Sequence, residues 1–301
     1  MKTTELHPKF KIAHLPSLLV KTYKAWDAEN PYRLSAVVAY YAILSMPGLL
    51  VIIVNLIGAI WGTEIVQGEL TNEISSALGR DVANAVGTMI SDTQEKDKNL
   101  ISTIIGIGTL LFAASGVFYH LQLSLNQIWK VDSITEQNFW RTLINRARSF
   151  TFILIIGFLL LISFIITAGL SALTNFLSRN FPDIILYVAY ILDILLSLSM
   201  VTILFALMFK YLPNVKIRWK SVWVGAIITA VLFVLGKFLL GLYFGRADFD
   251  STYGTAGTIV LILLWVSYSC LILFFGAEFT RVYAEKYGFG IKPTKYSKTI
   301  K

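Results

Sequence analysis

The sequence predicts an all-α protein: a polytopic membrane bundle of six transmembrane helices with short amphipathic interfacial helices. The 301 residues are 56% hydrophobic and 15% charged, with a mean hydropathy of +0.67, whereas soluble domains are roughly a quarter charged. Two apolar runs, 221–244 and 258–282, each exceed the roughly 20 residues that cross a bilayer core of ~30 Å. Only a short polar turn separates them. Composition and run length therefore exclude an ordinary soluble domain.

Apolar runs divide the chain into spans and connecting segments. A cytoplasmic amphipathic segment, 1–33, is expected before a transmembrane domain of residues 34–282, and a basic cytoplasmic tail, 283–301, after it. No linker or repeat divides the chain, which predicts one domain. The first run is too long and too far from the start for a cleavable signal peptide, so we expect the N-terminus to be retained. The predicted spans are about 34–61, 100–128, 149–176, 184–209, 221–244 and 258–282.

The N-terminal segment carries six Lys or Arg, and its apolar residues recur at helical spacing. This pattern predicts an amphipathic helix. Such a helix lies on the membrane surface, with its tryptophan and lysines at headgroup level, or packs on the end of the bundle. Both interpretations fit the sequence. The apolar positions are Leu15, Leu18, Leu19, Tyr23 and Trp26.

The first span contains Pro47 and Gly48 near its middle. They predict a kink, because proline removes a backbone hydrogen bond and clashes with the preceding turn. Tyr41, Ser45 and Asn55 fall with Gly48 along one face. A polar stripe of this kind lines a cavity or forms hydrogen bonds with neighbouring helices, and the sequence leaves both open.

The loop 62–99 is acidic and is expected on the outer side of the membrane. Its apolar residues predict two short amphipathic helices, whose apolar faces need cover from the bundle or the lipid interface. A lid over a cavity and an ordinary packed outer domain are both compatible with this pattern. The positions are Ile65, Leu70, Ile74 and Leu78, followed by Val82, Val86 and Met89.

The second span places His120, Ser124 and Gln127 on the face that contains Gly116. An unperturbed histidine titrates near neutrality, so His120 is a candidate proton carrier. A histidine that only forms a hydrogen bond between helices is the alternative. The third span has no ionisable residue, and we interpret it as structural or lipid-facing.

Three further ionisable residues fall inside apolar runs, where a charge costs a few kcal/mol unless it faces protein or water. Asp193 and Lys237 are predicted at similar depths in consecutive antiparallel spans, which favours a buried pair. Glu278 and His120 are expected toward the cytoplasmic ends of their spans. Glu278 has a second possible partner in Arg281, one turn further on. These groups form a ligand pocket or pathway, or they only fix the helices in place.

The basic residues predict the orientation. Six spans place both termini on the side that carries 20 of the 26 Lys and Arg, with Lys237 inside a span and five on the other side. The positive-inside rule then makes both termini cytoplasmic. Basic residues strung along a membrane face have anionic headgroups as their natural counter-charge. We therefore expect membrane lipids, and no nucleic acid, as partners.

The sequence contains the motifs AVVAYYAILSMPGLL (36–50), SLNQIWKV (124–131), YLPNVKIRWKSVWVGA (211–226), GLYFG (241–245), STYGTAG (251–257) and LLWVSYSCLILFFGAEFTRVYA (263–284). These motifs resemble the YihY/BrkB family of bacterial inner-membrane proteins. The resemblance extends from about residue 20 to residue 285, and the LPN, YGTAG and GAE motifs keep the family's order and spacing. It implies the bacterial cytoplasmic membrane. Some members carry an old ribonuclease label, and others are linked to virulence or envelope phenotypes.

The leading functional hypothesis is a transporter or exporter of an anionic or amphiphilic compound, such as a lipid or envelope precursor, through a polar cavity. The alternative is a non-catalytic envelope scaffold or assembly factor. A ribonuclease is disfavoured, because metal-dependent hydrolysis needs clustered carboxylates or histidines. With a single cysteine, Cys270, the sequence offers no thiolate metal site. We expect no enzyme activity, cofactor or metal; a homo-oligomer through GLYFG is possible.

Overall fold

The computed structural model describes residues 10–78, 80–94, 116–133, 182–244, 257–288, 290–294 and 297–299, with isolated helical positions between 151 and 162. The described part is mostly helical, and residues 116–128 form a helix that bears no label in the figures. Most of the predicted span 149–176 and the first half of 100–128 lie outside the described residues. The labelled helices are α1 (Leu15–Ala28), α2 (Pro31–Trp61), α3 (Thr63–Leu78), α4 (Arg80–Gln94), α7 (Pro182–Tyr211), α8 (Trp219–Phe244) and α10 (Gly257–Tyr287), with a 3-10 turn at Ile12–His14.

Three described helices are long and apolar enough to cross a membrane, which confirms a mostly helical protein with candidate membrane-spanning helices. The qualifying segments are Ile194–Tyr211 in α7, Trp219–Leu242 in α8 and Ile259–Tyr287 in α10. Helix α2 matches the first predicted span and is continuous through Pro47. The count of six spans stays a prediction.

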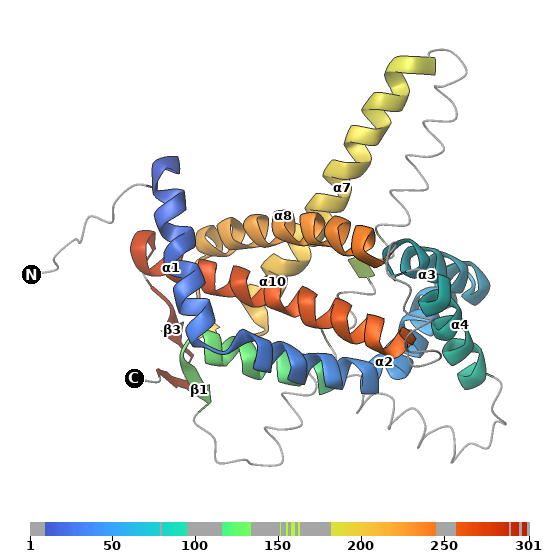
Figure 1. Cartoon of the computed structure of the whole chain (residues 1–301), viewed down its shortest axis with the longest axis horizontal. Helices are drawn as coiled ribbons and strands as arrows, with labels where there is room; N and C mark the ends of the chain where they lie inside the picture. The colour runs from blue at the N-terminus through green and yellow to red at the C-terminus, as the bar shows by residue number, and fades with distance from the viewer. Residues whose placement is uncertain are drawn as a thin grey trace, which may run out of the picture.

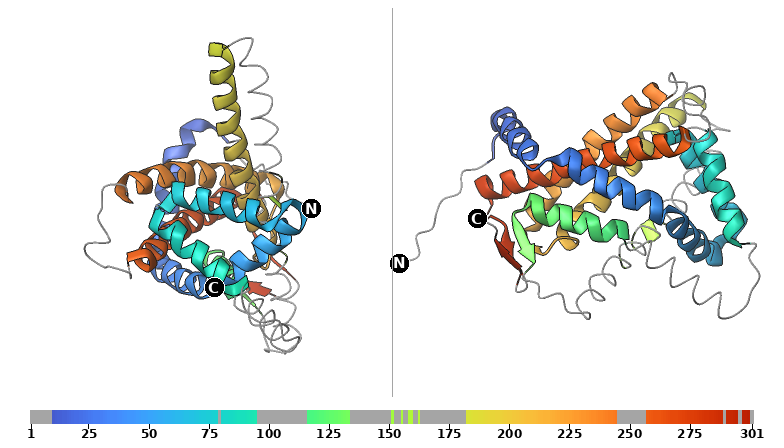
Figure 2. Two further views of the ribbon diagram at one scale, coloured as in Figure 1. Left: turned by 90° about the vertical axis from the view of Figure 1, so that its right-hand side faces the viewer. Right: turned by 60° about the horizontal axis from the view of Figure 1, so that its bottom comes forward.

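Helix α10 lies at the centre of the bundle, between α2 and α8 (Figure 1). The C-terminal part of α7 packs on α8, whereas its N-terminal part projects away from the other helices (Figure 1). At one end of the bundle α1 crosses steeply over α10, and at the other end the α3–α4 hairpin covers α2 and α10 (Figure 2). Shorter helices therefore cover the bundle of long helices at both ends.

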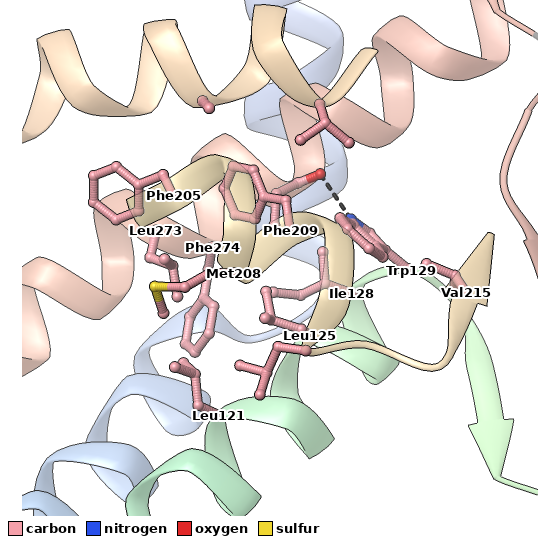
Figure 3. Packing of buried hydrophobic residues seen from close by; sticks show 14 of the residues in the cluster. Leu121, Leu125, Ile128, Trp129, Phe205, Met208, Phe209, Val215, Leu273 and Phe274 are labelled. Atoms are coloured by element: carbon pink, nitrogen blue, oxygen red, sulfur yellow. Dashed lines mark hydrogen bonds between the residues drawn. The ribbon is translucent and has the colours of Figure 1, made fainter. Parts of the chain in front are cut away.

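The main apolar core joins α2, the 116–128 helix, α7, α8 and α10 (Figure 3). Its largest fully buried side chains include Phe209 of α7 and Phe274 of α10. Leu125 and Ile128 of the unlabelled helix lie beside these two rings (Figure 3). In a bilayer these side chains stabilise the bundle through van der Waals packing, because lipid tails are as apolar as the side chains themselves.

Helices α8 and α10 approach each other through two interlocked glycine–threonine contacts. A Cβ atom on Gly225 of α8 would lie 1.7 Å from Thr280 Oγ1, and one on Gly276 of α10 would lie 1.8 Å from Thr229 Oγ1. Each threonine hydroxyl donates a hydrogen bond to the glycine carbonyl four residues earlier in its own helix, at 2.7 Å. Each hydroxyl is thereby satisfied, and each helix presents a glycine where the other presents a threonine. Small residues at such a crossing let two membrane helices pack closely.

Short antiparallel strands tie the C-terminal tail to two loops. Strand β1 (Val131–Ser133) pairs with β4 (Ser297–Thr299), and β2 (Val215–Lys216) pairs with β3 (Lys292–Pro293). The loops after the second and fourth predicted spans therefore lie at the same end of the bundle as the tail and α1 (Figure 1). This arrangement agrees with the predicted topology. The sequence predicted a basic tail and missed its strands.

The N-terminal helix packs on the bundle, which is one of the two interpretations that its sequence allowed. Leu18 is fully buried against Phe279, Val282 and Tyr283 of α10. Tyr23, Lys21 and Lys24 of the same helix are exposed, so the helix still presents a basic surface to its surroundings.

The two predicted helices of loop 62–99 are confirmed as α3 and α4, with one correction to their apolar face. Ile65 is 59% exposed, whereas its neighbour Val66 is 1% exposed and packs with Val82 and Val86. Val54 of α2 completes this second core. The hairpin is therefore fixed to the bundle by a continuous apolar core, as expected for a packed outer domain.

Substitution of Gly225 by alanine should destabilise the bundle by about 1–3 kcal/mol, because the new Cβ overlaps Thr280. Thermal denaturation in detergent would show a lower Tm. Adding Thr280→Ala removes the nearest atoms and should recover part of the loss.

Gly241→Ala is the matched control on the same helix, since no atom lies within 4 Å of its added Cβ. It should be neutral or slightly stabilising, because alanine favours helix over glycine by roughly 0.5–1 kcal/mol. Equal losses in Gly225→Ala and Gly241→Ala would contradict the close α8–α10 contact.

Candidate functional site

A buried carboxylate lies near the C-terminal end of α10. The Glu278 side chain is 0% exposed, and Arg281, one turn later, donates from Nε to both of its carboxylate oxygens at 3.1 Å. The guanidinium also reaches Glu285 at 2.7 Å, on the exposed side of the helix. Arg281 thus bridges one buried and one exposed carboxylate. Glu278 pairs with Arg281, the alternative partner that the sequence offered.

The turn after the 116–128 helix lies against the same part of α10. The indole N–H of Trp129 donates a buried hydrogen bond of 2.8 Å to the carbonyl of Ala277, next to Glu278 (Figure 3). Lys130 adopts a positive φ of 54° and reaches Glu29, at the end of α1, over 3.7 Å. Side chains from three segments therefore fix the surroundings of the Glu278–Arg281 pair.

Two predicted polar stripes meet between α2 and the 116–128 helix. The rings of Tyr41 and His120 are stacked, with centroids 3.6 Å apart and planes 12° apart. Gly116 also lies at this contact, since a Cβ added there would be 3.7 Å from the Tyr41 ring, an ordinary van der Waals distance. The predicted common faces of the two helices are in contact, and a titratable imidazole lies at that contact.

The other members of these stripes are placed as follows. Ser45 is buried and donates a hydrogen bond to the carbonyl of Ala42 in its own helix. Ser124 is buried, and Gln127 is half-buried. The side chains of Asn55, Pro47 and Gly48 lie outside what the structure describes.

Lys237 differs from its predicted placement. Its side chain is exposed on α8 and does not lie in the interior of the bundle. The backbone of Asp193 lies in α7, but its side chain falls outside the described part, so the Asp193–Lys237 pair stays a prediction. Burial was expected because a charge inside an apolar run favours a protein partner; sequence does not fix which way a helix faces.

The loop between α7 and α8 is held by polar side chains that the sequence analysis did not single out. Gln122 donates to the carbonyl of Leu212 at 2.7 Å, and the amide of Asn214 donates to Asn126 at 2.8 Å. Both side chains are buried. In the sequence the only signal for these two residues was their spacing of four, which places them on one face of a helix.

Two further features of the described residues bear on ligand binding. A shallow surface groove next to Arg281 is lined by Lys21, Ala25, Val282, Glu285 and Lys286. Within the described ranges, no three His, Cys, Asp or Glu side chains gather in a way that would hold a metal ion. The polar groups with the clearest functional potential are therefore the Glu278–Arg281 pair, the Tyr41–His120 stack and Lys237.

Removal of the Arg281 guanidinium should be strongly destabilising. Arg281→Met leaves Glu278 as an uncompensated buried charge, and breaking such a pair costs about 3–5 kcal/mol. Thermal denaturation in detergent measures this loss, and Glu278→Gln added to Arg281→Met should recover much of it. Glu285→Gln, which removes only the exposed partner, should cost less than about 1 kcal/mol. Similar losses in Arg281→Met and Glu285→Gln would argue against a buried pair.

Comparisons with known proteins place the sequence in a family. Residues 22–300 match the family described as virulence factor BrkB. A UPF0761 membrane protein from Saccharophagus degradans is 26% identical over 283 residues, which cover 91% of this chain and 61% of that protein. Another from Mannheimia succiniciproducens is 23% identical over 281 residues, covering 90% of this chain and 91% of that protein.

The relatives differ in length from the chain. A UPF0761 membrane protein from Idiomarina loihiensis is 30% identical over 180 residues, 59% of this chain and 60% of that protein. The chain covers only 47% of the similar proteins from Verminephrobacter eiseniae and Delftia acidovorans. No solved structure matches it. Because the family match includes nearly all of the sequence, the chain belongs to the virulence factor BrkB family of membrane proteins, as its motifs predicted.

Proposed function

We propose that this membrane protein transports or exports an anionic or amphiphilic compound, with a lipid or envelope precursor as the expected cargo. The observation that carries the proposal is the exposure of Lys237 within an apolar membrane helix. Its neighbours Phe238 and Leu239 are also exposed. A cation on such a surface needs an anionic partner, and the bilayer offers anionic amphiphiles at that place.

The face of α8 that bears Lys237 changes from buried to exposed along the helix. Ala226 and Ala230 fall on the same side at helical spacing and are fully buried, whereas Lys237 and Gly241 are exposed. The change occurs toward the end of α8 near which α7 diverges from the bundle (Figure 1). We propose that an amphiphile reaches Lys237 sideways from the bilayer along this exposed part of α8.

Depth supports the same proposal. Lys237 follows Trp219, the first residue of α8, by 18 residues, or about 27 Å at 1.5 Å per residue. A bilayer core is ~30 Å thick, so an ammonium at this height lies close to the far headgroup level. Lys237 would then contact the anionic group of an amphiphile while its apolar part lies along α8.

The Tyr41–His120 stack is the proposed coupling element. Its imidazole lies between two helices, and histidine changes charge near neutral pH when unperturbed. Relative movement of α2 and the 116–128 helix would alter this contact. The proposal assigns the protein no catalytic step and no cofactor.

A scaffold or assembly factor for the envelope is the second candidate. The ion pairs of α10 are satisfied within the chain, and strand pairs tie the tail to two loops. A rigid body of this kind suits a protein that only positions others. In that case Lys237 would contribute only to helix packing or to membrane insertion, and it would bind no transported compound.

Lys237→Met should abolish most transport while leaving the fold intact. In proteoliposomes that contain a fluorescent anionic phospholipid, wild type should move the label between leaflets, and the variant should do so at least tenfold more slowly. Lys237→Arg should retain most of the rate, because it keeps the charge. Dithionite quenching measures the label in the outer leaflet.

Lys24→Met is the control, since Lys24 is an exposed lysine of α1 outside the spanning helices. It should leave the rate unchanged. Wild-type protein that moves no label, or a Lys237→Met variant that moves it at the wild-type rate with an unchanged Tm, would favour the scaffold. Asp193→Leu added to Lys237→Met should stay inactive if the charge serves cargo, whereas a structural pair would tolerate the double change.

A further inference from the structure

A row of exposed aromatic rings lies at the corner between α7 and α8. Tyr211, at the end of α7, is 55% exposed, and Trp219 and Trp223, at the start of α8, are each 41% exposed. The Tyr211 and Trp219 rings are 6.0 Å apart in an edge-to-face arrangement, and Trp223 follows at 6.3 Å. Three large rings thus form one continuous exposed surface, here named the aromatic row.

A lysine is fixed beside this row. The Lys210 ammonium donates a hydrogen bond of 2.5 Å to the carbonyl of Ile217 and lies 5.4 Å from the centre of the Trp219 ring. An ammonium has three donors, and the Ile217 carbonyl takes one of them. The Lys210 position is therefore held by the loop and the ring, and donors remain for an anionic group.

The corner is basic and preformed. Residues 210–220 contain four Lys or Arg and no Asp or Glu, and Lys216 and Lys220 are exposed. The loop that carries them is fastened by Gln122 and Asn126 and by the β2–β3 pair. Binding at this corner would require little reordering of the backbone, which lowers its entropic cost.

Membrane position identifies the chemistry that fits the aromatic row. The row lies where the apolar α8 begins, and Trp and Tyr rings concentrate at the boundary between acyl chains and headgroups. A cation held there meets lipid phosphate, and each basic residue near an anionic surface adds about 1 kcal/mol of attraction. Soluble anions would gain nothing from the three exposed rings.

We propose that the aromatic row and Lys210 bind the headgroup of an anionic phospholipid, with the phosphate at Lys210 and the upper acyl chain along Trp223. The site lies at the end of α8 opposite to Lys237, and the inference does not depend on transport, because a scaffold would use the same contact.

Native mass spectrometry of the full chain in detergent, with added phosphatidylglycerol or phosphatidylcholine, tests the site. Wild type should retain phosphatidylglycerol at least fivefold better than phosphatidylcholine at equal concentration. Lys210→Met should remove most of this preference, and Trp223→Ala should weaken the retention of both lipids. Lys24→Met should leave the preference unchanged.

Three outcomes would overturn the inference. They are equal retention of the two lipids by wild type, an unchanged preference in Lys210→Met, and displacement of the lipid by millimolar inorganic phosphate, which would indicate a free-anion site.

Because Lys210 also contacts Ile217, the Tm of each variant is measured in parallel. If Lys210→Met lowers the Tm, Trp223→Ala becomes the deciding variant, because the exposed Trp223 ring is not needed for folding. Lipid retention by Trp223→Ala that equals the wild-type retention also contradicts the site. Failure here leaves Lys237 and its transport assay untouched.

Discussion

The close contact between α8 and α10 is the constraint on which the rest of the structure depends. Two glycines and two threonines interlock there, so neither helix can rotate or slide without a clash. Helix α10 also packs on α1 and α2. The contact therefore fixes which side of α10 buries Glu278 and which side of α8 is left exposed. In a bilayer, where apolar burial adds little to helix association, such van der Waals contacts and small residues determine packing.

The sequence was sufficient for much of the fold and for some of the site. Long apolar runs predicted α7, α8 and α10, and helical spacing predicted α1, α3 and α4. The shared faces that contain Tyr41 and His120 were also recognisable, because both stripes follow the helical period. Those inferences needed only local order along one helix, and the structure agrees with them. The GAE motif indicated Glu278, and its neighbour Arg281 was visible one turn later.

What the sequence could not supply was the rotation of each helix and every contact between distant segments. Lys237 illustrates the first point: its position within an apolar helix was predictable, but whether it faced protein or surface was not. The strand pairs of the tail and the Trp129–Ala277 hydrogen bond illustrate the second, since their partners are far apart in the chain. Gln122 and Asn126 appear as ordinary polar residues until the α7–α8 loop lies beside them.

The distribution of charge separates the two ends of the bundle. At the end with the tail, carboxylates such as Glu29 and Glu278 have cationic partners within the chain, and several lysines remain on the surface. Toward the other end of α8, Lys237 is exposed among apolar side chains. A purely structural charge would be expected to have its partner inside the bundle, because an unpaired ion in hydrocarbon is costly. We therefore propose that the partner of this exposed cation comes from the membrane, as an anionic lipid.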